Sequence, residues 1–593
     1  RHAGAFMGPM VMTGRGWIAA GLAEPTLWVN GEQYRMVYNV QTTRYLPGKL
    51  IQEYNDENLN FTTELCYLTS RSVAIRSIVK NMSQKPVKVS FDWNGGVYEP
   101  TSVVSSIDKG LSFIRPKDST NTVIRFLTAD KIQAVGSDSL HVTEKSEMTL
   151  EPGKTYQSEM TQTLTLRGED TAKELAAIAT LNIDNCFELN EQQWNAQIAS
   201  LLSGNSKYLK DNKYRKVLVK AMMTLNSNYR TPAGDILHGG SNPSYNGFIN
   251  GIWSWDSWKI ASGNVHFNEE IAKSEMITLF DYQADNGMVP DFISYNKKYN
   301  NWRDAKPPVA AWGAMNVYKA TGDKKFLETM FDKLYKFHQW WYAERDHNHN
   351  GICEYGSTDG TLIAACWESG MDNGVRFDDA VMQKNSEKAW SMNQENICLN
   401  SFLYVDKTIL AEMATLLNKP ELAAQLNAEA KVIKEFVQTK MWDKETGFFY
   451  DTRIDTGEHI KVMGAECWLP LWAGIATPEQ AKQVMQKMMD PQKFNSTLPL
   501  GTLDISHPRL RPVRGYWRGP VWVDQVYFGI TGLRNYGFDR EADILTEKFI
   551  NNAQGLTTDG PIHENYNPLT GEALNSPNFG WSSACIIKML LDE

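Results

Sequence analysis

The sequence has few features that cross-link a fold or carry it across a membrane. Its seven cysteines, among 593 residues, are odd in number and scattered, and no two form a Cys-x-x-Cys pair. This pattern argues against a disulfide scaffold and a cysteine zinc site, so we expect buried free thiols. No apolar run approaches the ~18 residues that a membrane helix requires, so we expect no membrane span.

Basic residues are also scarce relative to acidic ones. The chain has 60 Lys and Arg against 69 Asp and Glu, a net charge of −9, and no long basic run. This argues against a nucleic-acid partner. What the sequence does have is 19 Trp, many of them in loop-like stretches. Because flat aromatic rings pack on the apolar faces of sugars, carbohydrate is the leading class of substrate.

The chain begins Arg1-His2-Ala3, with neither an initiator Met nor a signal-peptide pattern. We interpret this as a processed or trimmed form. We expect a periplasmic or secreted protein, with a cytoplasmic location as the alternative.

Residues 1–167 have the pattern of a β-domain. Residues 87–93 alternate apolar and polar side chains, as a half-buried strand does. Similar patterns or β-branched content occur at 59–69, 71–79, 122–127 and 155–166. Many short strands with no helices between them predict a β-sandwich.

From residue 168 onward the pattern is helical. Amphipathic segments at 171–181 and 188–202 predict a helical linker over 168–211, followed by a helical domain over 212–593. Short turns alternate there with connections of roughly 20 to 50 residues, which indicates a ring of helical hairpins with functional loops on one rim. The alternative, a continuous solenoid, lacks a fixed sequence period. The predicted helices are 212–229, 253–264, 267–284, 308–320, 324–344, 395–417, 420–438, 466–475, 478–489, 519–534, 538–552 and 580–591.

One of the long connections contains Trp-Glu-Ser-Gly-Met-Asp-Asn at 367–373. Gly370 and Asn373 lie too close together for a core helix, so we predict an irregular loop beside a pocket. Asp372 has apolar neighbours, which raise the pKa of a carboxyl group as a general acid requires. The alternative is that Asp372 caps the next helix. Trp367 and Glu368 of this motif are candidate substrate-binding residues.

A second connection contains Ile-His-Glu-Asn-Tyr-Asn-Pro-Leu-Thr-Gly at 562–571. Asn-Pro and Thr-Gly predict a rigid turn. Glu564 lies among polar residues that can keep a carboxylate ionised and hold a water molecule, an environment opposite to that of Asp372. We therefore predict that Glu564 is a general base, with a surface turn as the alternative. His563 is a candidate substrate-binding residue.

Three further stretches are rich in Trp. In the first, at 250–258, Asp256 is placed to accept hydrogen bonds from vicinal sugar hydroxyls while Trp255 and Trp258 pack on the sugar. The same spacing fits buried Trp at a helix N-terminus, so both alternatives stay open. The stretches 306–312 and 514–522 repeat the theme. They add the candidate substrate-binding residues Trp312, Trp517, Arg518 and Trp522.

These motifs together resemble glycoside hydrolase family 63, in order and over residues 230–593. The resemblance implies a β-sandwich followed by a catalytic α/α six-hairpin barrel, or α/α toroid, over 212–593. It also implies an inverting, exo-acting hydrolase of α-glucosidic or related α-linked bonds in oligosaccharides. The family's general acid falls on Asp372 and its general base on Glu564. Its sugar-binding positions fall on Trp255, Asp256, Arg518 and Trp522.

Two other functions stay open. A glycoside phosphorylase on similar architecture would need a cationic phosphate pocket in place of an ionised Glu564. A non-catalytic glycan-binding protein would use the Trp-rich loops alone.

The stretch at 346–354 predicts a structural Ca²⁺ site. Oxygen ligands stand at loop positions 1, 3, 5 and 9, a Gly at position 6 and a backbone carbonyl at position 7, the order of an EF-hand-like loop. Position 12 is Ser357 instead of Glu, and the family resemblance suggests Glu395 as the missing carboxylate. The alternative is an Asn- and Gly-rich turn without a metal. The predicted ligands are Asp346, Asn348, Asn350, Ile352, Glu354 and Glu395.

Overall fold

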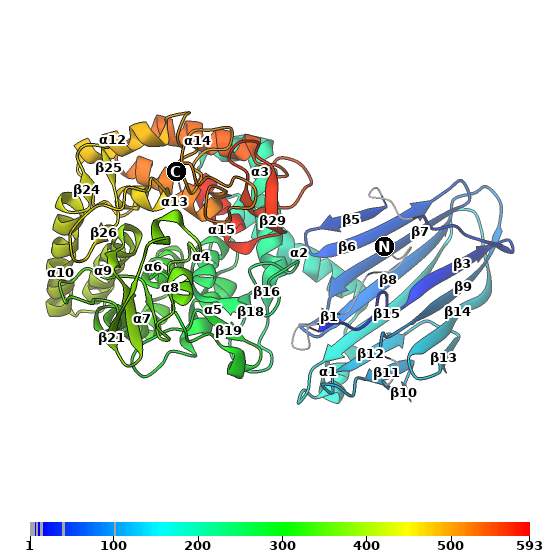
Figure 1. Cartoon of the computed structure of the whole chain (residues 1–593). Coiled ribbons are helices and arrows are strands. Elements are labelled where there is room, and N and C mark those ends of the chain that lie inside the picture. Colours follow the sequence, from blue (N-terminus) through cyan, green and yellow to red (C-terminus); the bar gives the residue numbers. More distant parts are fainter. Residues whose placement is uncertain (1–5, 7–9, 12–15, 38–41, 100–101, 593) are drawn as a thin grey trace. The chain divides into compact units, whose positions relative to one another are not determined.

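The computed structural model describes residues 6, 10–11, 16–37, 42–99 and 102–592. They form two compact units, Arg1–Ala199 and Ser200–Glu593. The first is rich in strands and the second is mainly helical, in agreement with the order predicted from the sequence (Figure 1). Among the described residues, no helix is both long and apolar enough to cross a bilayer. All seven cysteines are free thiols, six of them buried, which confirms that prediction.

The N-terminal unit contains two antiparallel sheets. The larger has the strand order β10-β11-β12-β15-β8-β7-β6-β5, and the smaller the order β13-β14-β9-β3-β4. A short pair, β1 (Met10–Val11) and β2 (Gly16–Trp17), is separate. The larger sheet consists of β5 (Thr43–Leu46), β6 (Lys49–Asn55), β7 (Leu59–Tyr67), β8 (Ser72–Asn81), β10 (Val103–Ile107), β11 (Gly110–Ile114), β12 (Asn121–Phe126) and β15 (Thr155–Thr165). The smaller consists of β3 (Glu24–Val29), β4 (Glu32–Gln33), β9 (Val87–Gly96), β13 (Lys131–Val135) and β14 (Ser139–Leu150).

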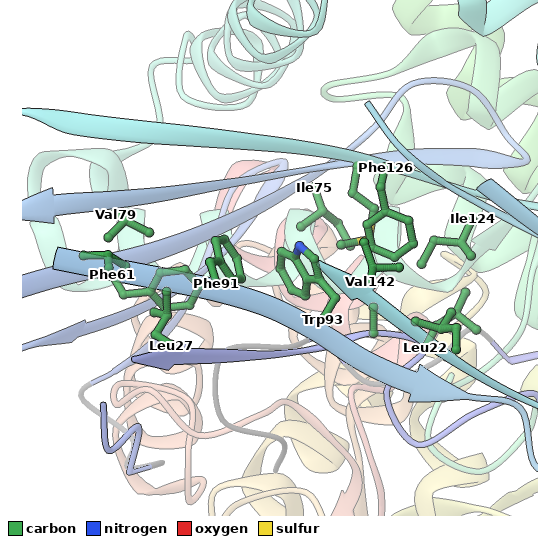
Figure 2. Packing of buried hydrophobic residues seen from close by; sticks show 14 of the residues in the cluster. Leu22, Leu27, Phe61, Ile75, Val79, Phe91, Trp93, Ile124, Phe126 and Val142 are labelled. Carbon is green, nitrogen blue, oxygen red and sulfur yellow. The ribbon is translucent and has the colours of Figure 1, made fainter. Parts of the chain in front are cut away.

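Both sheets contribute to one apolar core. In β9 the side chains alternate between buried and more exposed, as the sequence predicted. Phe91 and Trp93 of β9 meet Phe61 of β7 and Phe126 of β12 in this core (Figure 2). The ring centroids of Phe91 and Trp93 lie 4.9 Å apart, and those of Trp93 and Phe126 lie 6.4 Å apart. The two sheets are therefore held together by side chains from facing strands.

The helices predicted as a linker belong mostly to the N-terminal unit. They are α1 (Thr171–Ala179) and α2 (Ile183–Leu201), and α2 begins earlier than predicted because Asn182 Oδ1 accepts a hydrogen bond from the amide of Asn185 at 2.8 Å. Ile183 and Phe187 are buried with residues of β7 and β8. The boundary between the units, after Ala199, falls inside the range predicted as the linker.

The C-terminal unit consists of helices joined by loops and short strand pairs. Its helices are α3 (Asn212–Asn228), α4 (Ser254–Asn264), α5 (Glu269–Phe280), α6 (Ala310–Thr321), α7 (Lys324–Glu344), α8 (Leu362–Glu368), α9 (Ile397–Leu416), α10 (Pro420–Thr439), α11 (Leu469–Trp472), α12 (Pro478–Met488), α13 (Val523–Asn535), α14 (Asp539–Asn552) and α15 (Gly580–Leu591). Single 3₁₀ turns lie at Lys207–Lys210, Lys297–Tyr299, Val375–Phe377 and Ala465–Trp468. The short helix α8 was not predicted.

Short strand pairs connect the loops of this unit. They are formed by β16 (Tyr229–Arg230), β17 (Gly240–Ser241), β18 (Gly251–Trp253), β19 (Phe292–Ser294), β20 (Gly356–Ser357), β21 (Met382–Ser386), β22 (Ala389–Met392), β23 (Gln394–Glu395), β24 (Trp442–Asp443), β25 (Phe448–Phe449), β26 (Thr452–Arg453), β27 (Val521–Trp522), β28 (His563–Tyr566) and β29 (Ala573–Pro577). Each pairing is antiparallel.

The helices divide into an inner and an outer group. Every residue of α4 is buried, whereas α7 and α10 bury one stripe each. The inner helices pack in the order α4, α6, α9, α11, α13 and α15, and α15 packs back against α4. Local signals produce the hairpins between the groups. At the end of α6, Gly322 has φ 67°, and Asp323 then caps α7 by accepting a hydrogen bond from the amide of Phe326 at 3.0 Å.

Candidate active site

One cavity of the C-terminal unit brings distant motifs together. Its volume is about 70 Å³. Its polar lining includes three carboxyl groups, Asp256, Asp372 and Glu564, and one cation, Lys306. The predicted acid and the predicted base thus face the same space, although 192 positions separate them in the chain. Its aromatic wall consists of Phe248, Trp253, Trp255, Tyr516, Trp517, Trp522, Phe579 and Trp581.

Asp372 lies on an irregular loop that follows α8. Gly370 has φ 68°, and a Cβ at that position would lie 2.3 Å from Cζ2 of Trp255. Only glycine satisfies both the left-handed backbone and this close approach. The hydroxyl of Ser369 accepts a hydrogen bond from the amide of Met371 at 3.0 Å and so helps shape the loop. The loop predicted from Gly370 and Asn373 is confirmed.

The surroundings of Asp372 favour its protonated form. Burial raises the pKa of Asp372 to about 6, an effect that the nearby Lys306 ammonium opposes and the Asp291 carboxyl reinforces. The direction agrees with the prediction made from the apolar neighbours. A carboxyl group in this range can hold a proton near neutral pH and release it to a substrate.

Glu564 lies on the strand β28, just before the predicted turn. β28 pairs with β27 and with β29, and an irregularity in the β28–β29 register falls at Glu564. This irregularity brings the amide of Ser576 to Oε2 of Glu564, at 3.2 Å. The hydroxyl of Tyr516 donates to Oε1 at 3.0 Å. The turn predicted from the Asn-Pro and Thr-Gly pairs follows later, where the amide of Gly571 donates to the carbonyl of Asn567 at 2.8 Å.

The predicted contrast in pKa between the two acids is wrong. Burial raises the pKa of Glu564 to about 7, and the charge of Asp372 adds to the rise, while the hydrogen bonds from Ser576 and Tyr516 lower it. The polar sequence neighbours do not surround the carboxylate, because His563 contacts the carbonyl of Leu574 through Nδ1, at 3.2 Å. Both acids therefore have pKa values near neutrality, about 6 for Asp372 and about 7 for Glu564.

The first Trp-rich motif serves both the cavity and the core. Trp255 and Asp256 open α4 and line the cavity. Burial raises the pKa of Asp256 to about 7, which Lys259 and Lys306 partly offset. Trp258 does not reach the cavity. It is buried between Phe280 and Phe337 of the helical core, so its prediction as a sugar-binding residue is corrected.

The third Trp-rich motif supplies one face of the cavity. Trp517 and Trp522 are stacked, with ring centroids 4.0 Å apart and planes 7° apart. Indole Nε1 of Trp522 donates to the carbonyl of Tyr516 at 2.9 Å and holds that residue at φ 59°. A left-handed, non-glycine residue is uncommon, and here it aims the Tyr516 hydroxyl at Glu564.

Arg518 of the same motif does not line this cavity. Its Nε donates to the carbonyl of Asn373 at 2.9 Å, and its guanidinium pairs with Asp378. The Asn373 side chain in turn bonds the carbonyl of Gly515 and the amide of Trp517, each at 3.0 Å. Arg518 therefore joins the loop of Asp372 to the loop that contains Tyr516. It lines a second, open depression, together with Asp378, Asp379, Arg509 and Arg511.

Four other predicted substrate-binding residues lie outside the cavity lining. Trp312 is buried against Trp472 and Tyr527, and Glu368 is buried in an ion pair with Arg345 at 2.8 Å. Trp367 is half-buried under the guanidinium of Arg303, and His563 is half-buried against β29. Of these four, only His563 is adjacent in sequence to a residue of the cavity lining.

Several cavity residues were missed. Lys306 and Tyr516 lie inside motifs that the sequence analysis identified. The available signals were the lysine of the stretch 306–312 and the tyrosine hydroxyl next to Trp517. Phe248, Phe579 and Trp581 carried no comparable signal. Behind the wall, the Lys259 ammonium lies 3.3 and 3.6 Å from the ring centroids of Trp255 and Trp581 and pairs with Asp524 at 2.9 Å.

The oxygen-rich loop at 346–354 forms a tight turn. Both oxygens of Asp346 accept backbone hydrogen bonds, from Asn350 and Gly351, each at 3.0 Å. Nδ2 of Asn350 donates to Oε1 of Glu395 at 2.8 Å, so Glu395 lies beside the loop. His347 turns away toward Asn385.

The donors of this loop fit a hard cation in kind. Among the described residues, no three His, Cys, Asp or Glu side chains are grouped closely enough to hold a metal by themselves. A complete ligand set would therefore need the amide oxygens of Asn348 and Asn350 and the carbonyl of Ile352. Oε1 of Glu354 is buried without a hydrogen-bond partner. Burial raises the pKa of Glu354, and Asp346 and Glu395 add to the rise.

A cavity with an aromatic wall and two buried carboxyl groups is the arrangement of an enzyme that hydrolyses glycosidic bonds. The fold and the site together define a glycoside hydrolase. The family model of the mannosylglycerate hydrolase MGH1-like glycoside hydrolase domain matches residues 250–582, more than half of the chain. The chain therefore belongs to this family, within glycoside hydrolase family 63.

Similar proteins include several hydrolases of small glycosides. Mannosylglycerate hydrolase of Rubrobacter radiotolerans is 27% identical over 416 residues, which cover 57% of this chain and 90% of that protein. Glucosylglycerate hydrolase of Mycolicibacterium hassiacum is 23% identical over 421 residues, which cover 57% and 91%. The crystal structure of the family 63 mannosylglycerate hydrolase of Thermus thermophilus with Tris has a TM-score of 0.53 at 24% identity, covering 63% and 99%. At that identity the likeness shows the fold.

Proposed function

We propose that the protein is an inverting, exo-acting glycoside hydrolase that cleaves α-glucosidic or related α-linked bonds in oligosaccharides. The observation that carries the proposal is the meeting of Asp372 and Glu564 in one aromatic-walled cavity. Asp372 is the general acid, which gives its proton to the glycosidic oxygen as the bond from that oxygen to the anomeric carbon breaks. Glu564 is the general base, which takes a proton from the water that attacks this carbon from the opposite face.

The hydrogen bonds support this division of roles. Glu564 accepts from an O–H on one oxygen and from an N–H on the other, so both partners stabilise its ionised form. Once Glu564 is ionised, its charge disfavours ionisation of Asp372 and helps to keep the acid protonated. The pKa of Asp372, about 6, lies below that of Glu564, about 7, so the division of roles rests on the donors at Glu564 and not on the order of these values.

Sugar recognition is assigned to the remaining lining. In the described part of the chain, no group donates a hydrogen bond to the Asp256 carboxylate, which leaves both oxygens for sugar hydroxyls. The stacked indoles of Trp517 and Trp522, with Trp255, supply apolar surface for a pyranose ring.

The experiment is a panel of trehalose, kojibiose, nigerose, mannosylglycerate and glucosylglycerate, with product detection. The similar proteins named above, together with trehalases that match about half of the chain, favour small glycosides of this size. We expect cleavage of an α-glucosyl compound, no dependence on phosphate, and loss of cleavage in Asp372→Asn and Glu564→Gln. Phosphate-dependent release of a sugar phosphate would indicate the phosphorylase, and binding without turnover would indicate a glycan-binding protein.

The proposed architecture is a β-sandwich followed by an α/α six-hairpin barrel, or α/α toroid. The shared core of the two sheets supports the first part. The closed packing order of α4, α6, α9, α11, α13 and α15, each followed or preceded by an outer helix, supports the second.

We also propose a structural Ca²⁺ at the loop 346–354, with Glu395 beside it. Binding only to the folded state stabilises it by mass action, about 2.7 kcal/mol at a concentration of 100 times Kd. We expect a chelator to lower Tm, Ca²⁺ to restore it better than Mg²⁺, and Asp346→Ala to abolish the chelator effect. A chelator that changes nothing, together with no calcium in elemental analysis, would reduce the loop to a turn.

A further inference from the structure

Lys306 is the only lysine in the lining of the cavity as the structure describes it, and it lies against two buried acids. Its ammonium is 3.3 Å from Oδ1 of Asp291 and 3.7 Å from Oδ2 of Asp304. The other oxygens of these two acids both accept from Nδ2 of Asn301, at 2.9 and 2.8 Å. The three charged groups thus form one buried cluster, which we call the Lys306 cluster.

The cluster is attached to the loop of the proposed acid. Lys306 Nζ donates a hydrogen bond to the carbonyl of Trp367, one of the last carbonyls of α8, at the helix end that carries partial negative charge. Asp372 follows five residues later and lines the same cavity as Lys306. The amide of Ala305, next to Lys306, donates to Oε1 of Glu368 at 3.2 Å. Lys306 and its neighbour Ala305 therefore both bond to the C-terminal end of α8.

We propose that Lys306 is a positioning residue for the reaction, the cation that stabilises the Asp372 carboxylate as this acid gives its proton to the leaving oxygen. The inference rests on the proposed function of Asp372. During that step the proton moves to the glycosidic oxygen, the bond to the anomeric carbon breaks, and negative charge develops on Asp372 in the cavity that Lys306 also lines. Asp291 and Asp304 hold the ammonium in place and limit its effect on Asp372.

The charge balance around Asp372 supports this role. Burial raises the pKa of Asp372, Lys306 opposes this rise and Asp291 adds to it. The other titratable groups in the same lining are Asp256, Tyr516 and Glu564. Burial raises the pKa of Asp291 and of Asp304, so the cluster can hold a proton as well as the ammonium. Lys306 remains charged, because the two acids raise its pKa above the usual range.

Removing a positive or a negative charge from the Lys306 cluster should shift the pKa of Asp372 in opposite directions. In Lys306→Met, loss of the cation should raise the pKa of Asp372, so the alkaline limb of the kcat/KM profile should move up by about one pH unit. In Asp291→Asn, loss of the carboxylate that raises the pKa of Asp372 should move the same limb down. The double variant should lie near the wild-type limb, because the two charge changes cancel.

Activated substrates separate catalysis from folding. An α-glucosyl fluoride needs little protonation of its leaving group, so Lys306→Met should lose about tenfold in kcat on the disaccharide that the panel identifies and much less on the fluoride. Thermal melting of each variant verifies that it is folded, and the double variant serves if Lys306→Met does not fold. The inference would be overturned if the alkaline limbs of Lys306→Met and Asp291→Asn moved in the same direction. A folded Lys306→Met with an unmoved alkaline limb and an unchanged kcat would also overturn it.

Asp372→Asn, measured in parallel, keeps the two proposals distinguishable. If Asp372→Asn retains activity with an unchanged alkaline limb, the assignment of the acid has failed. If Asp372→Asn is inactive on the disaccharide while the limb of Lys306→Met stays at the wild-type position, only the role of Lys306 has failed.

Discussion

The two proposed catalytic carboxyl groups are held in different ways. Asp372 lies on a loop shaped by residues close to it in sequence, such as Ser369 and Gly370. Glu564 lies on a strand, and its partners Tyr516 and Ser576 come from other segments. The loop was therefore recognisable from local sequence, whereas the surroundings of Glu564 depend on pairing between strands. The environment of a site residue can be predicted from its sequence neighbours only where those neighbours also surround it in the structure.

The largest effects should come from the carboxyl groups themselves, and they should differ between substrates. Glu564→Gln removes the base that every substrate needs, so turnover should fall by about 10²–10⁴ on disaccharide and glycosyl fluoride alike. Asp372→Asn should cause a similar loss on the disaccharide and a much smaller one on the fluoride, which needs little protonation. Steady-state kinetics on both substrates measures the contrast. Equal losses of the two variants on both substrates would contradict the division of roles.

The loop of Asp372 should be sensitive to a single methyl group. Gly370→Ala adds a left-handed alanine and a contact at 2.3 Å with Trp255, so we expect lower stability, by about 2–4 kcal/mol, and weaker activity. Gly322→Ala is the matched control, since Gly322 has φ 67° and no atom within 4 Å of the added methyl. Denaturant unfolding should show about 1 kcal/mol for the control. If both variants lost the same free energy of unfolding, the close contact between Gly370 and the ring of Trp255 would not restrict the side chain at position 370.

The smallest of these effects should come from Tyr516→Phe, which tests the distant support of Glu564. The hydroxyl stabilises the ionised carboxylate, so its loss should raise the pKa of Glu564 above about 7. The acidic limb of kcat/KM should therefore move to higher pH, with about a tenfold loss of kcat/KM below it. The alkaline limb should stay in place. A shift of the alkaline limb alone would assign Tyr516 to the acid instead.

Much of the fold and part of the site were predictable from the sequence. The strand at 87–93 and helices such as 580–591 follow from periodicity, which each segment carries by itself. Asp372 and Asp256 were found because unusual residues cluster around them. Trp258 and Trp312 look the same in sequence but point into the core, because the direction of a helical side chain depends on which neighbours the helix meets. The raised pKa of Glu564 had no sequence signal, since burial by distant segments causes it.

The stereochemistry of the first product tests the central claim most directly. A water molecule must fit between Glu564 and the anomeric carbon, which requires the two carboxyl groups to be ~6.5–9.5 Å apart and leads to inversion. Proton NMR during cleavage of an α-linked glucoside should then show β-glucose first, before mutarotation forms the α-anomer. First appearance of α-glucose, or a trapped glycosyl ester on either carboxyl group, would contradict the account.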